Sequence, residues 1–95
     1  MNTSIPFQMP ILPPKVVHAN TNFKKLVGFR IRQRRLLAHL SQDDLADRCG
    51  IYRTYLSRIE TGLANPSLVT LVALATTLGV QVSEFFRLEE LGLAR

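Results

Sequence analysis

The chain has 95 residues, of which 46% are apolar, and its formal net charge is +5. A chain of this length forms one small domain with a modest core, and it is too short to enclose a deep catalytic cleft. Its single cysteine excludes an internal disulfide and suits a reducing compartment. The first residues lack the pattern of a signal peptide, and no segment is apolar enough to span a membrane. We therefore expect a soluble cytoplasmic protein without a membrane partner.

Residues 1–21 are expected to form an extended arm, separate from a domain over residues 22–95. The arm holds four of the five prolines of the chain, and proline blocks helices and central strands. Such a terminal segment is often only a loose tail. This one is more apolar than an ordinary linker, so contact with its own domain, a second subunit or another protein partner is the alternative. Its apolar residues include Ile5, Phe7, Met9, Ile11 and Leu12.

A first helix is expected over about residues 23–39, with Asn22 as its N-cap. Its apolar stripe follows helical spacing at Phe23, Val27 and Ile31. The basic residues of the chain concentrate on this helix and on the segment that follows it.

The distribution of charge is more informative than the net value. Residues 1–22 carry one basic residue and no acidic one, and residues 63–95 carry two basic and three acidic residues. Residues 23–62 carry nine basic and four acidic residues, so the positive charge lies there. A basic surface of this kind is typical of phosphate binding, although it is also often only a solvated surface.

Two short helices joined by a glycine follow, in the sequence LSQDDLADRCGIYRTYLSRIETG. Ser41 can N-cap the first of them, and Asp44 can complete a weakened capping box. Gly50 is placed to end that helix, and a second helix runs to about Glu60 before Gly62 stops it. Two helices joined by a tight glycine turn form a helix-turn-helix, whose second helix can lie in the major groove of DNA.

The second motif helix, about residues 52–60, has a polar face opposite Leu56 and Ile59. Arginine presents two parallel donors that match the O6 and N7 atoms of guanine. Arg53 lies nearest to the helix end that enters the groove, so it is expected to read a base. Arg58 lies further along and is suited to holding a phosphate or to remaining solvated.

Two further helices complete the expected fold, a compact all-α domain of five helices. Ser67 and Gly79 bound the fourth helix, and Ser83 can cap a fifth. The buried stripe of the fourth helix is expected at Leu68, Leu71, Val72, Ala75 and Leu78. That helix must face the core, so the surplus apolar surface lies on the fifth helix, and such a surface usually marks an interface. The residues of this expected dimer interface are Phe86, Leu88 and Leu91.

One ion pair is expected from spacing alone. Arg35 lies four residues after Ile31 on the buried stripe of the first helix, and Glu60 lies four residues after Leu56. Each charge is expensive to bury without a partner, and each is the obvious partner of the other. The pair would fix the angle between the first helix and the proposed recognition helix, unless both side chains turn outward separately.

Five segments resemble the Cro and lambda-repressor family of bacterial and phage helix-turn-helix regulators: LGFRIRQRR, LSQDDLA, GIYRTYLSRIETG, NPSL and LGVQVSEFF, in that order. The resemblance covers about residues 26–86. It implies a five-helix domain of a bacterial or phage protein that binds double-stranded DNA as a homodimer on a palindromic operator.

The resemblance also implies a set of DNA contacts. Gln42 matches a glutamine that begins the first motif helix at the DNA backbone and often holds the side chain that reads a base. Arg35 and Glu60 match an internal ion pair of the family. Tyr52 replaces the small Ser or Thr usual at the N-cap, so its role as a cap is in doubt. The expected DNA contacts are Gln42, Tyr52, Arg53, Thr54, Tyr55, Ser57, Arg58 and Asn65.

Three classes of function were compared. A transcriptional regulator is the expected one, and the alternative is an antitoxin that binds a toxin protein, through the apolar arm, and represses its own operon. An enzyme is not expected, because the sequence lacks a nucleophile–base pair, a carboxylate dyad, a phosphate-cradling glycine loop and a metal-ligand set. No cofactor and no metal are expected.

Overall fold

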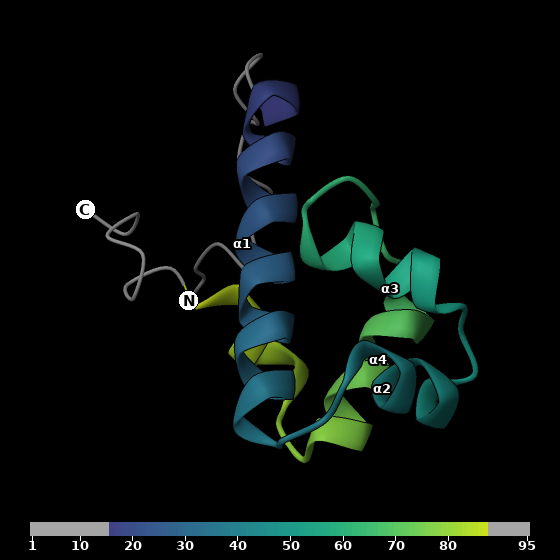
Figure 1. The fold of residues 1–95 in the computed structure, drawn as a ribbon. Helices are drawn as coiled ribbons and strands as arrows, with labels where there is room; N and C mark the ends of the chain where they lie inside the picture. The colour runs from purple at the N-terminus through teal and green to yellow at the C-terminus, as the bar shows by residue number, and fades with distance from the viewer. Residues whose placement is uncertain (1–15, 88–95) are drawn as a thin grey trace, which may run out of the picture.

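The structure is a computed structural model that describes the backbone of residues 16–87 and the side chains of residues 23–87. Every regular element in this part of the chain is helical, which confirms the expected all-α class. Figure 1 shows the long first helix standing beside a compact group formed by the three that follow it. The elements are α1 (Val16–Leu37), α2 (Gln42–Cys49), α3 (Arg53–Glu60), α4 (Leu68–Leu78) and the short 3₁₀ helix η1 (Val82–Phe86).

Helix α1 begins earlier than expected. It starts at Val16, so the expected cap Asn22 lies inside the helix, and residues 16–21, assigned to the extended arm, are helical. The last proline of the arm is Pro14, so no residue after it blocks the helix. The remainder of the expected arm, residues 1–15, lies outside the described residues.

The C-terminal end of α1 comes at Leu37, two residues before the expected end. His39 adopts a left-handed conformation with φ of 60°, and the backbone N–H of Leu40 donates to the Arg35 carbonyl at 3.1 Å. A left-handed residue after the last turn ends a helix because it turns the chain away while satisfying the free carbonyls. The chain is thereby directed into α2.

The start of α2 is capped as expected. The Asp44 backbone N–H donates to the Ser41 hydroxyl at 3.0 Å, and the Ser41 backbone N–H donates to the Asp44 carboxylate at 3.2 Å. The hydrogen bond from the Ser41 backbone N–H to the carboxylate lowers the pKa of Asp44, because it favours the charged form. At the other end, Gly50 has a φ of 71°, which ends the helix at almost no steric cost.

The core lies between α1 and the other helices, and α4 is rotated relative to the expectation. Its buried residues are Leu71, Leu74 and Ala75, whereas Leu68 and Val72 are exposed. The expected stripe was shifted by about one residue, because an almost uniformly apolar helix does not show which face is inside. Among residues 23–87, the buried apolar side chains are Leu26, Val27, Ile31, Leu45, Ala46, Leu56, Ile59, Leu71, Leu74, Ala75 and Phe85.

The expected fifth α-helix is not present in the described residues. Residues 82–86 form a five-residue 3₁₀ helix instead, preceded by Gln81, and Ser83 lies inside it without capping it. Phe85 is fully buried and anchors η1 against α1 and α4. A single large apolar anchor holds such a short element in place. The continuation of the expected helix, including Leu88 and Leu91, lies outside the described residues.

None of the helices over residues 16–87 is both long enough and apolar enough to cross a membrane.

Candidate nucleic-acid interface

Helix α3 presents one face to the core and the opposite face to solvent. Leu56, Ile59 and Glu60 are buried, whereas Arg53, Thr54 and Arg58 are exposed. Tyr52, at the N-cap, is exposed over 83% of its surface and makes no side-chain cap bond. The first turn of α3 therefore leaves its backbone N–H groups and an aromatic ring accessible, an arrangement suited to phosphate and sugar contacts.

The turn between α2 and α3 fixes how this face is presented. The Ile51 backbone N–H donates to the Ala46 carbonyl at 3.0 Å, and the Ile51 side chain lies half-buried against the core. The turn is thus held both by a hydrogen bond to α2 and by packing of Ile51 against the core. The two helices meet as a helix-turn-helix, and α3 runs from this turn toward α1 (Figure 1).

A buried charge network fixes the other end of α3. The Arg35 Nε donates to Glu60 Oε2 at 2.7 Å, and the Arg35 Nη2 donates to Glu60 Oε1 at 3.0 Å. The Arg35 Nη1 donates to the Leu40 carbonyl at 2.9 Å, which ties the loop after α1 to the same group. The bond to Glu60 raises the pKa of Arg35 against the opposing effect of burial. The structure therefore contains the ion pair inferred from spacing.

Gln42 belongs to this network. Its Nε2 donates to Glu60 Oε1 at 3.0 Å, so its side chain is turned toward the end of α3. The sequence-based role had Gln42 holding the side chain that reads a base, whereas here it holds a buried carboxylate. Its backbone still begins α2. The amide therefore positions α2 relative to α3, and its contact with DNA stays a prediction.

Glycine allows α1 to lie directly against α3. A Cβ atom on Gly28 would lie 2.2 Å from the Ile59 carbonyl oxygen and 2.8 Å from that of Glu60. Both contacts are with backbone, which cannot turn away as a side chain can. Sequence reasoning missed this contact, although a glycine in the interior of a helix is the signal for a close approach.

A second charge cluster joins α1 to η1. Arg30 is only 1% exposed, and its Nη2 lies 3.7 Å from Glu84 Oε2, which also accepts a short hydrogen bond from Arg34. The Arg87 Nη1 also donates to Glu84 Oε2, at 3.3 Å. The bond from Arg34 and then that from Arg87 lower the pKa of Glu84 against the effect of burial. The burial of Arg30 was not expected from the sequence, although Arg30 lies four residues after Leu26, which is also buried.

An exposed ion pair links the first turns of the two motif helices. The Arg53 Nε lies 3.5 Å from Asp43 Oδ1, and the two side chains are 50% and 75% exposed. This distance allows an ion pair but exceeds that of a strong hydrogen bond. This contact was not predictable from the sequence, because Asp43 and Arg53 are ten positions apart on different helices.

The remaining expected contacts occupy different surroundings. Thr54 is exposed, Ser57 is half-buried, and Tyr55 is half-buried against the core, so only part of each of the last two can reach a ligand. The Arg58 Nη2 contacts the Leu63 carbonyl at 3.4 Å, which directs its side chain toward the loop after α3. Asn65 is exposed on that loop. These residues therefore lie on or next to α3, but they differ in how exposed their side chains are.

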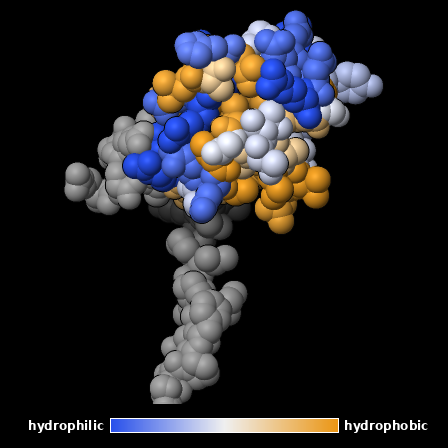
Figure 2. All heavy atoms as spheres, turned by 90° about the horizontal axis from the view of Figure 1, so that it is seen from below, coloured by the Kyte–Doolittle hydropathy of each residue, from blue (hydrophilic) through white to orange (hydrophobic). Residues whose placement is uncertain are grey.

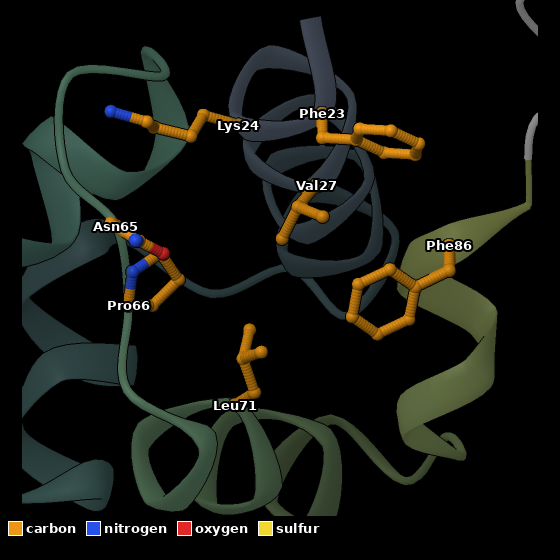
Figure 3. A pocket seen from close by; sticks show the side chains of 7 residues that line it. All are labelled: Phe23, Lys24, Val27, Asn65, Pro66, Leu71 and Phe86. Carbon is orange, nitrogen blue, oxygen red and sulfur yellow. The ribbon is translucent and has the colours of Figure 1, made fainter. Parts of the chain in front are cut away.

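A small hollow of about 130 Å³ lies between α1, the loop after α3, α4 and η1 (Figure 3). The Val27 and Leu71 side chains point toward one another at its centre, and Phe86 reaches in from η1. Asn65 and Lys24 lie on the side of the α3–α4 loop. The lining is therefore mostly apolar, and it includes Phe86, a residue of the expected dimer interface.

The described side chains include no group suited to metal binding. No three His, Cys, Asp or Glu residues within residues 23–87 are placed to share a metal ion. The thiol of Cys49 is half-buried and donates to the Thr77 hydroxyl at 3.3 Å. The chemistry offered at α3 is instead that of hydrogen-bond donors and positive charge on a helix that can enter a groove.

These features define the class of protein, a helix-turn-helix domain, and comparisons with known proteins agree. The helix-turn-helix family HTH_3 matches residues 31–85. Control protein C.BamHI of Bacillus amyloliquefaciens is 38% identical over 72 residues, which are 75% of this chain and 89% of that protein.

Solved structures show the same relationship. The restriction-modification controller protein C.AhdI from Aeromonas hydrophila is 38% identical, with a TM-score of 0.65, over 66% of this chain and 96% of its own. SinR, a master regulator for biofilm formation solved in complex with DNA, is 35% identical, with a TM-score of 0.62, over 64% of this chain and 98% of its own.

The chain belongs to the helix-turn-helix family HTH_3, of the Cro and lambda-repressor type. This is a family of DNA-binding regulators, not of enzymes.

Proposed function

We propose that this chain is a transcriptional regulator that binds a specific sequence of double-stranded DNA as a homodimer. In each subunit α3 lies in the major groove of one half of a palindromic operator. Two such helices must then be spaced about one turn of DNA apart, roughly 34 Å. The cytoplasm of a bacterium is the location that this function requires.

The outward face of α3 is the observation that carries the proposal. Arg53, Thr54 and Arg58 are exposed on a helix whose other face is buried and whose last residue is fixed by a charge network. A reading helix has to be rigid, because a side chain that is misplaced by about 1 Å loses a bidentate contact. The direct base contacts are expected from Arg53, with Tyr52, Tyr55 and Asn65 at the sugar–phosphate backbone.

The dimer interface is proposed on α4 and η1. Leu68, Val69 and Val72 are exposed on α4, with Leu68 71% exposed, and Phe86 is 44% exposed on η1. α4 faces the core as expected, but Leu68 and Val72, which were expected to be buried, add an apolar surface on α4 to the one expected at the end of the chain. Figure 2 shows apolar surface reaching the outside between two hydrophilic areas. A two-fold contact through such a surface would place both α3 helices on the same side of the DNA.

The relatives favour a regulator over the antitoxin alternative, since they are named as control and regulator proteins. A protein partner bound through the N-terminal arm would be the mark of an antitoxin. A pull-down with the full chain should therefore recover DNA alone if the chain is a regulator, and a protein complex that deletion of residues 1–15 abolishes if it is an antitoxin.

Selection of bound fragments from a pool of random DNA tests the proposal. We expect a two-fold symmetric consensus whose half-sites lie about one helical turn apart. Recovery of no consensus, or of a consensus without symmetry, would contradict it.

Sedimentation of two matched variants tests the interface. Leu68→Asp should yield a folded monomer that binds the operator weakly, because the charge would be buried between subunits. Leu37→Asp, on an exposed leucine of α1, should leave the dimer unchanged. A dimer of ordinary stability in Leu68→Asp would place the interface elsewhere.

A further inference from the structure

Asp43, to which no role was assigned from the sequence, lies beside the residue proposed to read a base. We propose that Asp43 is a positioning residue that orients the guanidinium of Arg53 for guanine and lowers the affinity for unspecific DNA. This inference rests on the proposed function of α3.

The contact is made with one particular nitrogen of Arg53. Asp43 Oδ1 faces the Nε, at 3.5 Å, and no described residue accepts a hydrogen bond from Nη1 or Nη2. A guanidinium that reads guanine end-on uses its two terminal nitrogens for O6 and N7 and leaves the Nε free. The carboxylate therefore occupies the one edge that such a contact does not need, and it restricts the rotation of the fork.

Asp43 is itself held in place. It lies in the first turn of α2, where the helix dipole favours a carboxylate, directly after Gln42, whose amide is bonded to the buried Glu60. The Ser41–Asp44 capping box fixes the same turn from its other side. The backbone from which Asp43 projects is therefore held by the same network that fixes the end of α3.

The contact should become stronger on DNA. The two side chains are 50% and 75% exposed in the free protein, where water weakens their attraction. DNA displaces that water, and the lower local dielectric strengthens a charge-assisted contact. On unspecific DNA, Arg53 makes no guanine contact, so nothing offsets the repulsion between Asp43 and the phosphates. Asp43 should thus favour the operator over other sequences.

Asp47 provides the matched control. It is exposed on the same helix, carries the same charge, and its side chain forms no ion pair among residues 23–87. Asp43→Ala and Asp47→Ala therefore remove equal charge, but only Asp43→Ala removes the contact with Arg53. The capping box uses neither residue, so both variants should fold, with no more than the small change in melting temperature of a surface substitution.

The test measures binding of the full chain to the selected operator, to random DNA, and to the operator with the Arg53-contacted guanine replaced by 7-deazaguanine, which lacks N7. Both single variants should bind random DNA about two- to fivefold more tightly at low salt. Only Asp43→Ala should also lose discrimination between guanine and 7-deazaguanine, by about threefold or more. Asp43→Asn, which keeps an oxygen acceptor without the charge, should restore part of it.

Each outcome decides the inference. Equal discrimination in Asp43→Ala and Asp47→Ala would overturn it and leave DNA recognition by α3 intact. A change of discrimination by Asp43→Ala in an Arg53→Ala background would also overturn it, because the effect would not pass through Arg53. If no operator is recovered at all, the proposed function fails, and the inference fails with it.

Discussion

Two arginine–carboxylate pairs lie at the two ends of α3, and they differ mainly in burial. Arg35 and Glu60, at the C-terminal end, are 8% and 1% exposed in their side chains and share two hydrogen bonds. Arg53 and Asp43, at the N-terminal end, are largely exposed and lie at the limit of an ion pair. The same chemistry thus fixes the helix at one end and leaves charges available to a ligand at the other.

The difference follows from the cost of desolvation. A buried charge that loses its partner destabilises the fold by several kcal/mol, whereas an exposed pair contributes about 0–1 kcal/mol. The buried pair is therefore expected to act on stability and the exposed pair on binding. Four predictions test this division.

The largest effect is expected at the buried end. Glu60→Ala leaves the Arg35 guanidinium buried without its carboxylate and removes the acceptor of Gln42, so it should lower the free energy of unfolding by about 3–5 kcal/mol. Urea denaturation followed by circular dichroism measures this. The double variant Arg35→Met/Glu60→Leu should lose less than Glu60→Ala alone. An unchanged unfolding midpoint for Glu60→Ala would show that the pair does not support the fold.

Gly28→Ala tests the close contact beside the buried pair. Alanine favours a helix interior over glycine by about 1 kcal/mol, but overpacking against backbone typically costs about 1–3 kcal/mol. The new Cβ would meet the Ile59 carbonyl oxygen at 2.2 Å, so the cost should prevail and the melting temperature should fall. Arg32→Ala, on the exposed face of α1, is the control and should change little. A rise in melting temperature for Gly28→Ala would mean that α1 and α3 can separate freely.

The exposed end should respond in binding instead of stability. Arg53→Ala should change the free energy of unfolding by less than about 0.5 kcal/mol and weaken operator binding by about 1–3 kcal/mol, at one base position of each half-site. Fluorescence anisotropy on operator and random DNA separates the two effects. Arg32→Ala removes the same charge from α1 and should not alter base preference. Equal loss on operator and random DNA would remove Arg53 from the reading role.

The smallest effect concerns pH. The pKa of Glu84 is lowered from its ordinary value of 4.5 by Arg34 and Arg87, so its charged form stabilises the contact between α1 and η1. This contribution is complete above the ordinary value and is lost as the pH falls through the lowered one. Thermal melts between about pH 6 and pH 3 should therefore show a smaller decline for Glu84→Gln than for the unchanged protein. Parallel declines would show that the cluster contributes nothing.

Local signals in the sequence were sufficient for the helix-turn-helix. Three features lie at the predicted residues: the Ser41–Asp44 capping box, the left-handed Gly50 and the end of α3 at Glu60. Each depends on neighbours within four positions, where backbone geometry decides the outcome. The pair between Arg35 and Glu60 could be predicted for another reason, since two charges on buried stripes each need a partner of opposite charge.

Other features could not be predicted from the sequence, because they depend on how the helices pack against one another. The sequence could not show which face of the uniformly apolar α4 is buried, or that Arg30 is buried beside Glu84. The start of α1 at Val16 was missed because Asn22 offered a plausible cap inside a segment that can also continue a helix.

The sequence by itself determined the helical class, the motif and the polar face of α3, because periodicity and capping act over one or two turns of chain. Only the tertiary structure decided that Arg30 is buried, that Gln42 turns to Glu60, and that Asp43 lies beside Arg53. These contacts join residues on different helices, and the packing of α1, α2 and α3 sets their distances. Helix packing thus buries one arginine in the fold and leaves the other exposed to solvent.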